Sequence, residues 1–323
     1  MINVLVTGGA GYIGSHCCKE LFNNGHNPIA FDNLVYGHRE NVKWGDFYKG
    51  DIGNTKDLET FFKKYKIDAV LHFAAYAYVG ESITDPQKYY LNNLRNTINL
   101  LYFILKKNIK YFIFSSTCAT YGNPNKIPID EDHPAAPINP YGRSKKMIEE
   151  ILEDYNRAYG LKFIGLRYFN AAGADPEGEL GEKHNPETHL VPLVLDVAAG
   201  KSKAIKVFGT DYDTKDGSCV RDYIHVTDLA KAHVLALERL LNEGSSSYFN
   251  LGTGRGHSVL EIIENASNIT GKKIPVTASN RRPGDPPALI ASNKKAINEL
   301  GWKPEHTNLD DIIRTAWNWH KRL

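Results

Sequence analysis

The most constraining feature of the sequence is a glycine-rich segment near its start. In VLVTGGAGYIG a short apolar run is followed by Gly8, Gly11 and Gly14, where a helical pattern opens. In such a strand–turn–helix unit the first glycine permits the tight turn, the second lets the backbone approach a pyrophosphate, and the third allows close helix–strand packing. The anion then lies at the helix N-terminus. Because turns in many folds use glycine, this interpretation depends on its context.

A carboxylate at the end of the next apolar run supplies that context. Asp32 follows PIAF, where a carboxylate accepts hydrogen bonds from both hydroxyls of an adenosine ribose and repels a 2′-phosphate. We therefore expect NAD rather than NADP as cofactor. The alternative is an aspartate that caps a turn in DNL. Asp51 in GDI and the run Phe73-Ala74-Ala75 stand at later strand ends, the edge where such sheets bind ligands.

Short apolar runs alternate with helix-length segments through the first half of the chain. This order predicts β-α-β units and a doubly wound (Rossmann) parallel sheet in an α/β fold. The expected strands are 4–7, 28–31, 69–73, 111–116 and 163–168, and the expected helices are 13–23, 56–65, 87–107 and 141–159.

After Asn170 this alternation ends, and a loop rich in glycine, proline and acidic residues follows. We expect the Rossmann domain in residues 1–175 and a smaller mixed α/β lobe in residues 176–323. A strand and helix in 222–242 and a short strand at 248–251 predict that the chain returns to the first sheet. The first domain is therefore expected to be rejoined by about 222–252, which makes the boundary discontinuous.

Composition excludes several classes of protein. Of the 323 residues 42% are hydrophobic and 24% charged, and the net charge is +2, so we expect a globular protein with no nucleic-acid or membrane partner. The first residues lack the pattern of a signal peptide, which predicts a cytoplasmic location. The cysteines have no zinc-site spacing, so we expect buried free thiols and no metal site; they are Cys17, Cys18, Cys118 and Cys219.

A tyrosine, a lysine and a threonine provide the candidate chemistry. In YGRSK, Tyr141 and Lys145 stand one helical turn apart. An ammonium and a nicotinium ring would lower the pKa of the phenol toward neutrality, so that it accepts a proton from a sugar hydroxyl while hydride leaves the same carbon. Thr117, in FSSTCATYG, supplies a hydroxyl for the substrate oxygen. A surface tyrosine beside a solvated lysine would explain YxxxK alone, but not the three elements together.

These motifs identify a family resemblance over nearly the whole chain. The sequence resembles the extended short-chain dehydrogenase/reductases, and within them the UDP-glucose 4-epimerases. The segments that carry the resemblance include VTGGAGYIGSH, FDNL, HFAAYAYVGES, FSSTCATYG, NPYGRSK, LRYFNAAGA, PETHLVP, DGSCVRDYIHV, NLGTGRGHSV and RRPGDPPALIAS. The resemblance implies bound NAD, a UDP-sugar substrate, a nucleotide-sugar-binding second lobe and a homodimer.

The resemblance also implies two sets of binding residues. Those of the cofactor are Gly8, Gly11, Tyr12, Ile13, Gly14, Asp32, Asn33, Asp51, Ile52, Phe73, Ala74, Asn92, Tyr141, Lys145 and Tyr168. Those of the substrate are Thr117, Tyr141, Asn170, His189, Leu190, Phe208, Arg221, Arg282, Asp285 and Leu289. For Arg221 and Arg282 the alternative is a structural ion pair with Asp222 or Asp285.

The chain departs from the family pattern at four positions. Ala77 stands where the pattern often has a lysine that contacts the cofactor, and Thr117 replaces a serine but keeps the hydroxyl. His189 replaces an asparagine in the nucleotide-binding set. Leu289 replaces a sugar-pocket residue, often Tyr or Cys, which leaves the choice of sugar open.

The expected activity is reversible epimerisation at C4 of UDP-glucose and UDP-galactose through a 4-keto sugar. Epimerisation of another UDP-sugar, such as UDP-N-acetylglucosamine or a UDP-pentose, remains an alternative. A nucleotide-sugar 4,6-dehydratase carries an Asp-Glu pair after the catalytic threonine, whereas this chain has Cys118-Ala119, which cannot perform those proton transfers. A non-catalytic NAD sensor would not need the three proton-relay residues.

Overall fold

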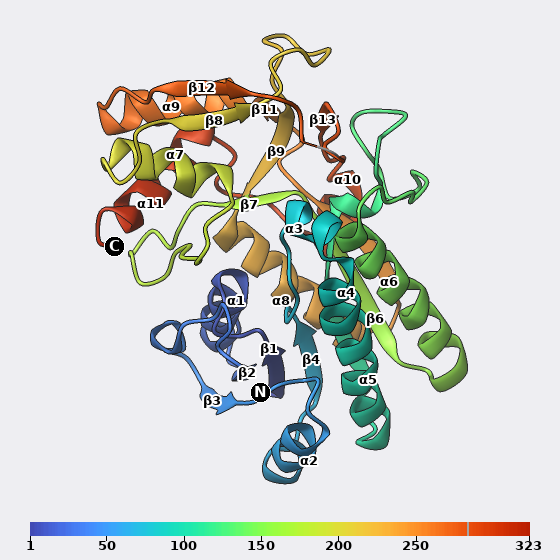
Figure 1. The fold of residues 1–323 in the computed structure, drawn as a ribbon. Coiled ribbons are helices and arrows are strands. Elements are labelled where there is room, and N and C mark those ends of the chain that lie inside the picture. Colours follow the sequence, from blue (N-terminus) through green and yellow to red (C-terminus); the bar gives the residue numbers. More distant parts are fainter. Residues whose placement is uncertain (283) are drawn as a thin grey trace.

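The computed structural model describes residues 1–282 and 284–323, and its centre is a seven-stranded parallel sheet (Figure 1). The strand order is β10-β6-β5-β4-β1-β2-β3, with all neighbours parallel. The predicted doubly wound α/β fold is confirmed. The strands are β1 (Asn3–Thr7), β2 (Asn27–Asp32), β3 (Asp46–Lys49), β4 (Ala69–His72), β5 (Tyr111–Thr117), β6 (Lys162–Tyr168) and β10 (Ser247–Leu251).

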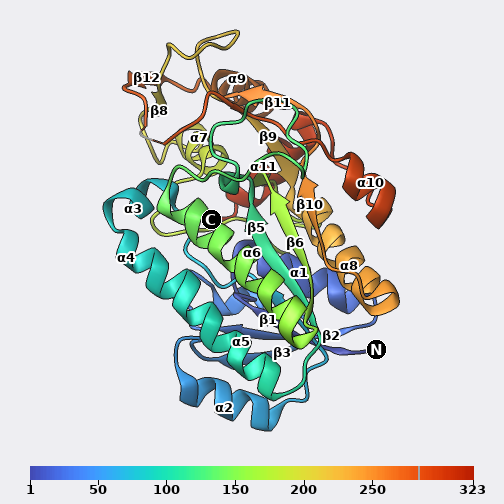
Figure 2. The ribbon, with the colours of Figure 1, turned by 90° about the vertical axis from the view of Figure 1, so that its right-hand side faces the viewer.

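Helices cover both faces of this sheet because its strands are apolar on both sides. In β1, Val4 and Val6 belong to the hydrophobic cluster under α1 (Tyr12–Asn23) and α8 (Val226–Glu243). Leu5 faces the opposite cluster, which is covered by α2 (Thr55–Lys64), α5 (Asn96–Lys106) and α6 (Pro140–Tyr159). Figure 2 shows α5 and α6 in front of the strands. The strand ends between these layers are left free to form a site.

A smaller lobe lies beyond one end of the sheet, at the top of Figure 1. Its four-stranded sheet has β9 paired with β7, β11 and β13, and a separate pair joins β8 and β12. A third hydrophobic cluster packs helices against these strands. The elements are β7 (Asn170–Ala172), α7 (Leu190–Ala198), β8 (Ile205–Phe208), β9 (Val220–His225), β11 (Gly256–Ser258), α9 (Val259–Thr270), β12 (Val276–Ser279), β13 (Ala288–Leu289) and α11 (Leu309–His320). Helix α10 (Lys294–Leu300) instead packs on the main domain, where Ala296 and Leu300 join the cluster under α1 and α8.

The structure differs from the sequence prediction in three elements. Strand β3 was not predicted, since this edge strand reads DFYK and has no apolar run. The helix expected over 87–107 is instead α4 (Pro86–Tyr89), a π-helical turn η2 (Tyr90–Arg95) and α5. The predicted return to the first sheet consists of α8 and β10, while β9 stays in the small sheet.

Three short helices complete the described elements: η1 (Arg39–Asn41), α3 (Val79–Thr84) and η3 (Cys118–Thr120).

The four cysteines are buried free thiols, as the sequence predicted. In the described part of the chain, no helix is both long and apolar enough to cross a membrane.

Candidate active site

One large cavity, of about 1000 Å³, lies between the carboxyl ends of the main sheet and the smaller lobe. Every residue that the sequence predicted for cofactor binding, substrate binding or catalysis lines it. We call its two sides the strand-end wall (the glycine loop, the ends of β2, β4 and β5, and the start of α6) and the lobe wall (His189, Leu190, Phe208, Arg221, Arg282, Asp285 and Leu289). The structure therefore brings the predicted residues together in one place.

The glycine loop leaves a concave backbone surface at the start of α1. Gly8 has φ +72, in the left-handed region, and a Cβ atom there would approach the backbone nitrogen of Ala74 to 2.8 Å. A Cβ on Gly14 would lie 2.2 Å from the carbonyl oxygen of Gly8, so the helix packs against the turn as predicted. A Cβ atom built on Gly11 would meet only the Gly8 carbonyl oxygen within 4 Å, at 3.2 Å. Its open side faces the cavity, where a ligand backbone or phosphate would fit.

Asp32 ends β2 and is held by the loops on either side. Its carboxylate accepts hydrogen bonds from the backbone nitrogens of Ala10 (3.0 Å) and Leu34 (2.8 Å). The side chain is buried, which raises the pKa of the carboxyl, and those two hydrogen bonds partly oppose the shift. The bond from Leu34 is the turn cap that was the alternative interpretation of Asp32. Asp32 also lines the cavity, however, so a capping role does not exclude cofactor binding.

The neighbouring strand ends position further polar groups. The Asn33 amide donates to the Asp51 carboxylate at 2.9 Å, so these two predicted residues fix each other. Asn92 lies in the π-helical turn η2, a distortion often found at functional sites. The next residue, Asn93, is buried and bonds to both backbone groups of Tyr76. The π turn therefore anchors the loop that follows β4.

The start of α6 explains why Tyr141 and Thr117 are neighbours. The Asn139 side chain accepts from the backbone nitrogen of Gly142 at 2.8 Å, and Pro140 occupies the first turn, so the helix begins just before Tyr141. A Cβ on Gly142 would lie 2.4 Å from the carbonyl oxygen of Ala119, so only glycine allows this close approach. Thr117 ends β5 and its hydroxyl hydrogen bonds to Tyr141.

Lys145 lies one turn further along α6 and is buried. Its ammonium donates to the Ser115 carbonyl oxygen at 2.7 Å. Burial lowers the pKa of Lys145 to about 7, and the charge of Glu149 opposes that shift. The Ser115 hydroxyl in turn hydrogen bonds to the Tyr168 hydroxyl.

The pKa of Tyr141 differs from the expectation that a neighbouring ammonium lowers it. Burial raises the pKa of Tyr141 to about 12, and the hydrogen bond with Thr117 partly opposes this rise. In this site the cost of desolvating the phenolate exceeds the help from nearby groups. A positive charge added to the cavity beside the ring would favour the phenolate.

The lobe wall carries two arginines toward the cavity. Arg221 donates to Asp285 at 2.6 Å, which is one of the ion pairs proposed as the alternative to substrate binding. Asp222 takes no part, because its buried carboxylate accepts from backbone nitrogens that include Thr253 and Ala291. The guanidinium of Arg282 lies 3.8 Å from the ring centroid of Phe208. Both arginines nevertheless line the cavity.

Leu289 lies at the junction of the two walls. It is 7% exposed and packs in a cluster with Cys118 and Phe169. Cys118 directly follows Thr117, so the side chain of Leu289 is close to the candidate catalytic hydroxyl. Its contact with a sugar stays a prediction.

A ring of two histidines and two glutamates lies beside the lobe wall. Each imidazole Nδ1 faces both carboxylates, at 2.9 and 3.0 Å for one histidine and 3.4 Å twice for the other. We call this group the His–Glu ring; its members are Glu182, His184, Glu187 and His189. The carboxylates raise the pKa of His184 to about 9 and of His189 to about 10, against the effect of burial.

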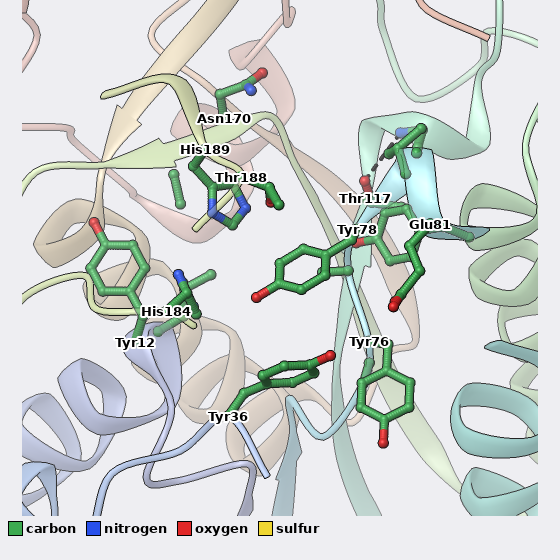
Figure 3. Close-up of a pocket in the computed structure, with 18 of the residues that line it drawn as sticks. Tyr12, Tyr36, Tyr76, Tyr78, Glu81, Thr117, Asn170, His184, Thr188 and His189 are labelled. Atoms are coloured by element: carbon green, nitrogen blue, oxygen red, sulfur yellow. Dashed lines mark hydrogen bonds between the residues drawn. The ribbon is translucent and has the colours of Figure 1, made fainter. Parts of the chain in front are cut away.

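Of the tyrosines around the cavity, the sequence predicted Tyr12 but not Tyr36, Tyr76 or Tyr78. Figure 3 shows Tyr12, Tyr36 and Tyr78 around the hollow, with His184 and His189 on one side and Thr117 on the other. The ring of Tyr36 meets those of Tyr76 and Tyr78 edge-on, each at 5.4 Å. The segment AYAYVGES, whose aromatic residues alternate directly after a strand, was the available signal.

Comparison with known proteins assigns the chain to a family. The profile of the "NAD dependent epimerase/dehydratase family" matches residues 4–252. The chain belongs to the NAD dependent epimerase/dehydratase family. This assignment confirms the resemblance identified from the motifs.

Relatives within the NAD dependent epimerase/dehydratase family match over almost the full length. The chain is 52% identical over 320 residues to a UDP-glucose 4-epimerase of Rhizobium meliloti (strain 1021), covering 99% of this chain and 97% of the relative. A crystal structure of UDP-glucose 4-epimerase from Brucella ovis in complex with NAD superposes with a TM-score of 0.95 at 52% identity and covers 98% of each chain. The enzyme from Bifidobacterium longum with NAD+ and UDP gives a TM-score of 0.95 at 42% identity, covering 99% of this chain and 98% of that one.

Proposed function

We propose that this protein is an NAD-dependent UDP-glucose 4-epimerase, which interconverts UDP-glucose and UDP-galactose. The observation that carries the proposal is that Thr117, Tyr141 and buried Lys145 share one cavity with a dinucleotide-type glycine loop and with two arginines. A dehydrogenase site and an anion site thus open into the same space. Relatives about 50% identical over nearly the full length carry that name.

The strand-end wall suits NAD. The concave glycine loop at the start of α1 offers backbone nitrogens to a pyrophosphate. Asp32 is anchored by two backbone hydrogen bonds and can still accept from ribose hydroxyls. When bound, NAD supplies a reversible hydride acceptor, so that epimerisation needs no external oxidant or reductant.

The residues of the chain then carry the proton. Tyr141 takes the proton of the sugar 4-hydroxyl as hydride leaves C4, and Thr117 hydrogen bonds the same oxygen. The positive charges of Lys145 and of the oxidised cofactor favour the phenolate over the neutral phenol. When the 4-keto sugar has rotated, Tyr141 returns the proton as hydride reaches the opposite face. Arg221 and Arg282 hold the UDP pyrophosphate during this rotation.

We also propose roles for the two lobes, a cellular location and an oligomeric state. We assign cofactor binding to residues 1–175 with α8 and β10, nucleotide-sugar binding to the rest of 176–323, and the protein to the cytoplasm. A homodimer is supported by exposed apolar side chains along the helical run 86–106, which are Leu91, Ile98 and Tyr102. Light scattering measures the mass in solution: twice the mass of one chain would support the homodimer, and the mass of one chain would contradict it.

The direct test is an assay of the purified protein with UDP-galactose. We expect conversion to an equilibrium mixture with UDP-glucose and no net change in redox state. A protein that holds NAD and converts no UDP-sugar would support the sensor alternative instead. A panel of UDP-sugars resolved by product would distinguish the hexose epimerase from one acting on N-acetylated sugars or pentoses.

A further inference from the structure

The His–Glu ring has more nitrogen–carboxylate contacts than its Nδ1 protons can turn into hydrogen bonds. Four contacts join two imidazole nitrogens to two carboxylates, at 2.9, 3.0, 3.4 and 3.4 Å. Each Nδ1 carries at most one proton, which it donates to one acceptor. Among the described residues, the Nδ1 of His184 is shielded from solvent yet makes no hydrogen bond of acceptable geometry. This nitrogen is aimed between the two carboxylates.

The same loop contains a contrasting acidic group that already holds a cation. Asp175, Glu177 and Glu179 surround the ammonium of Lys19 at 2.8, 2.6 and 2.7 Å. In the part of the chain that the structure describes, the two glutamates of the His–Glu ring have no such lysine or arginine partner; their ion-pair partners are the two histidines. The first group is neutralised by a lysine, and the second only by histidines, which can also act as metal ligands.

We propose that the His–Glu ring binds one divalent transition-metal ion, with Zn²⁺ as the best match. Zinc is commonly four-coordinate and tetrahedral, with nitrogen and oxygen ligands about 2.0–2.2 Å away, which places neighbouring ligand atoms about 3.3 Å apart. One ligand atom from each of the four residues lies within 4.8 Å of the others, and the nitrogen–carboxylate contacts of 2.9–3.4 Å span that value. Two imidazoles make the ring unsuited to Mg²⁺ and Ca²⁺, which take oxygen ligands.

The surroundings of the ring favour a structural ion. Four protein ligands close a tetrahedral site and leave no position for substrate. The Glu187 carboxylate also accepts from the backbone nitrogens of Thr188 and His189, which orients it. The Glu182 carbonyl accepts from the indole of Trp319 in α11 at 3.1 Å. The ion would thus fix the segment that leads into α7 and presents His189 and Leu190 to the cavity.

This inference revises the expectation of no metal site. That expectation came from the cysteine spacing, whereas the ligands here come from ExHxxExH in GEKHNPETH, whose members lie two, three and two residues apart. The ion itself would perform no step of the reaction, although His189 belongs to both the ring and the lobe wall. The proposal is therefore tested by metal binding, which does not depend on the proposed epimerase activity.

Zinc titration of the tag-free protein tests the proposal without an activity readout. The chain is stripped with a chelator and titrated with Zn²⁺ against a chromophoric competitor. We expect one equivalent bound at submicromolar affinity, and Co²⁺ should give the visible absorption of a four-coordinate site. If the wild-type chain takes up no Zn²⁺, the ring is a hydrogen-bonded network held by protons and the proposal is wrong.

A matched pair of variants locates the ion. Glu187→Gln removes one ligand charge at a residue that does not line the cavity, and we expect affinity for Zn²⁺ to fall more than about tenfold. Glu177→Gln removes a carboxylate from the Lys19 group on the same loop and should leave affinity unchanged. Zn²⁺ should raise the melting temperature of wild type and Glu177→Gln, but not of Glu187→Gln. Equal binding by both variants would contradict the assignment. Should Glu187→Gln not fold, the stoichiometry and Co²⁺ spectrum of the wild type still decide.

Discussion

The strand-end wall and the lobe wall of the cavity are built in different ways. On the strand-end wall, ligand-facing groups follow successive parallel strands, so Asp32 and Thr117 each stand where a strand ends. On the lobe wall, Arg221 comes from a small mixed sheet while Arg282 and Asp285 come from a loop between β12 and β13. The first wall is positioned by a repeating architecture, and the second by loop contacts such as the Arg221–Asp285 pair.

This difference suggests a division of labour. A rigid strand-end wall suits a permanently bound cofactor and a fixed proton acceptor, and the loop-built lobe wall can adjust to a sugar that must rotate. Changes to the first wall should therefore reduce turnover strongly. Changes to the second should mainly alter which sugar is accepted.

Tyr141→Phe should have the largest effect. It removes the oxygen that transfers the proton but keeps the ring, so kcat should fall about 10²–10⁴-fold while NAD and UDP-sugar still bind. Tyr159→Phe, at an exposed position of the same helix, is the matched control and should be unaffected. A wild-type rate for Tyr141→Phe would mean that the base lies elsewhere.

Lys145→Met should reduce turnover about 10- to 100-fold and change the pH profile. A base acts only when deprotonated, so the rate rises with pH toward its pKa. We propose that the Lys145 ammonium helps the bound cofactor to stabilise the phenolate, so its removal should raise the pKa of Tyr141 and move the rising limb to higher pH. The control is Lys146→Met, which removes the next lysine, an ion-pair partner of Glu150. An unmoved limb would show that Lys145 does not tune Tyr141.

Asp32→Ala should act on cofactor binding and less on chemistry. Loss of charge-assisted hydrogen bonds to the ribose should weaken NAD about 10- to 100-fold and reduce discrimination against NADP. The NAD content of the purified variant and its affinities for both cofactors measure this. Asp46→Ala, on the neighbouring edge strand, should retain the wild-type content. Full NAD content in Asp32→Ala would remove the aspartate from the cofactor site.

Leu289→Cys should have the smallest effect, confined to sugar choice. Leucine is shorter than tyrosine but bulkier than cysteine, so we expect good activity on UDP-glucose and UDP-galactose and weaker activity on the N-acetylated pair. A few methylenes are worth about 1–3 kcal/mol, so the preference should be partial. Leu289→Cys should raise the relative rate on UDP-N-acetylglucosamine, and Leu289→Tyr should lower it. An unchanged ratio in both variants would mean that Leu289 does not contact the sugar.

The strand-end wall was also the part that sequence reasoning could reach. Glycine spacing, an aspartate after the second strand and the YxxxK pair each have a local geometric meaning, so Gly8, Asp32 and Tyr141 were found from the residues themselves. Arg221 and Leu289 were found through family resemblance alone, because a loop contact between distant segments leaves no periodic signal. The His–Glu ring was missed for a related reason, since the sequence search for metal ligands began from cysteines.

The fold followed the same division. The buried parallel strands gave apolar runs, whereas edge strand β3 is half polar and was missed. The π turn at 90–95 was also missed, because its residues have ordinary helical propensities and the distortion depends on tertiary contacts such as Asn93 with Tyr76. Local propensity therefore identified the helix but not its break.

The central claim is that hydride leaves C4 and returns to it within one site, and the fate of an isotope label at that carbon tests it directly. UDP-galactose deuterated at C4 is incubated with the protein in ordinary water, and the UDP-glucose formed is analysed by mass spectrometry and NMR. The account predicts that the deuterium is retained at C4 of the product. Loss of the label to solvent, with hydrogen in its place, would contradict a mechanism of hydride transfer and return.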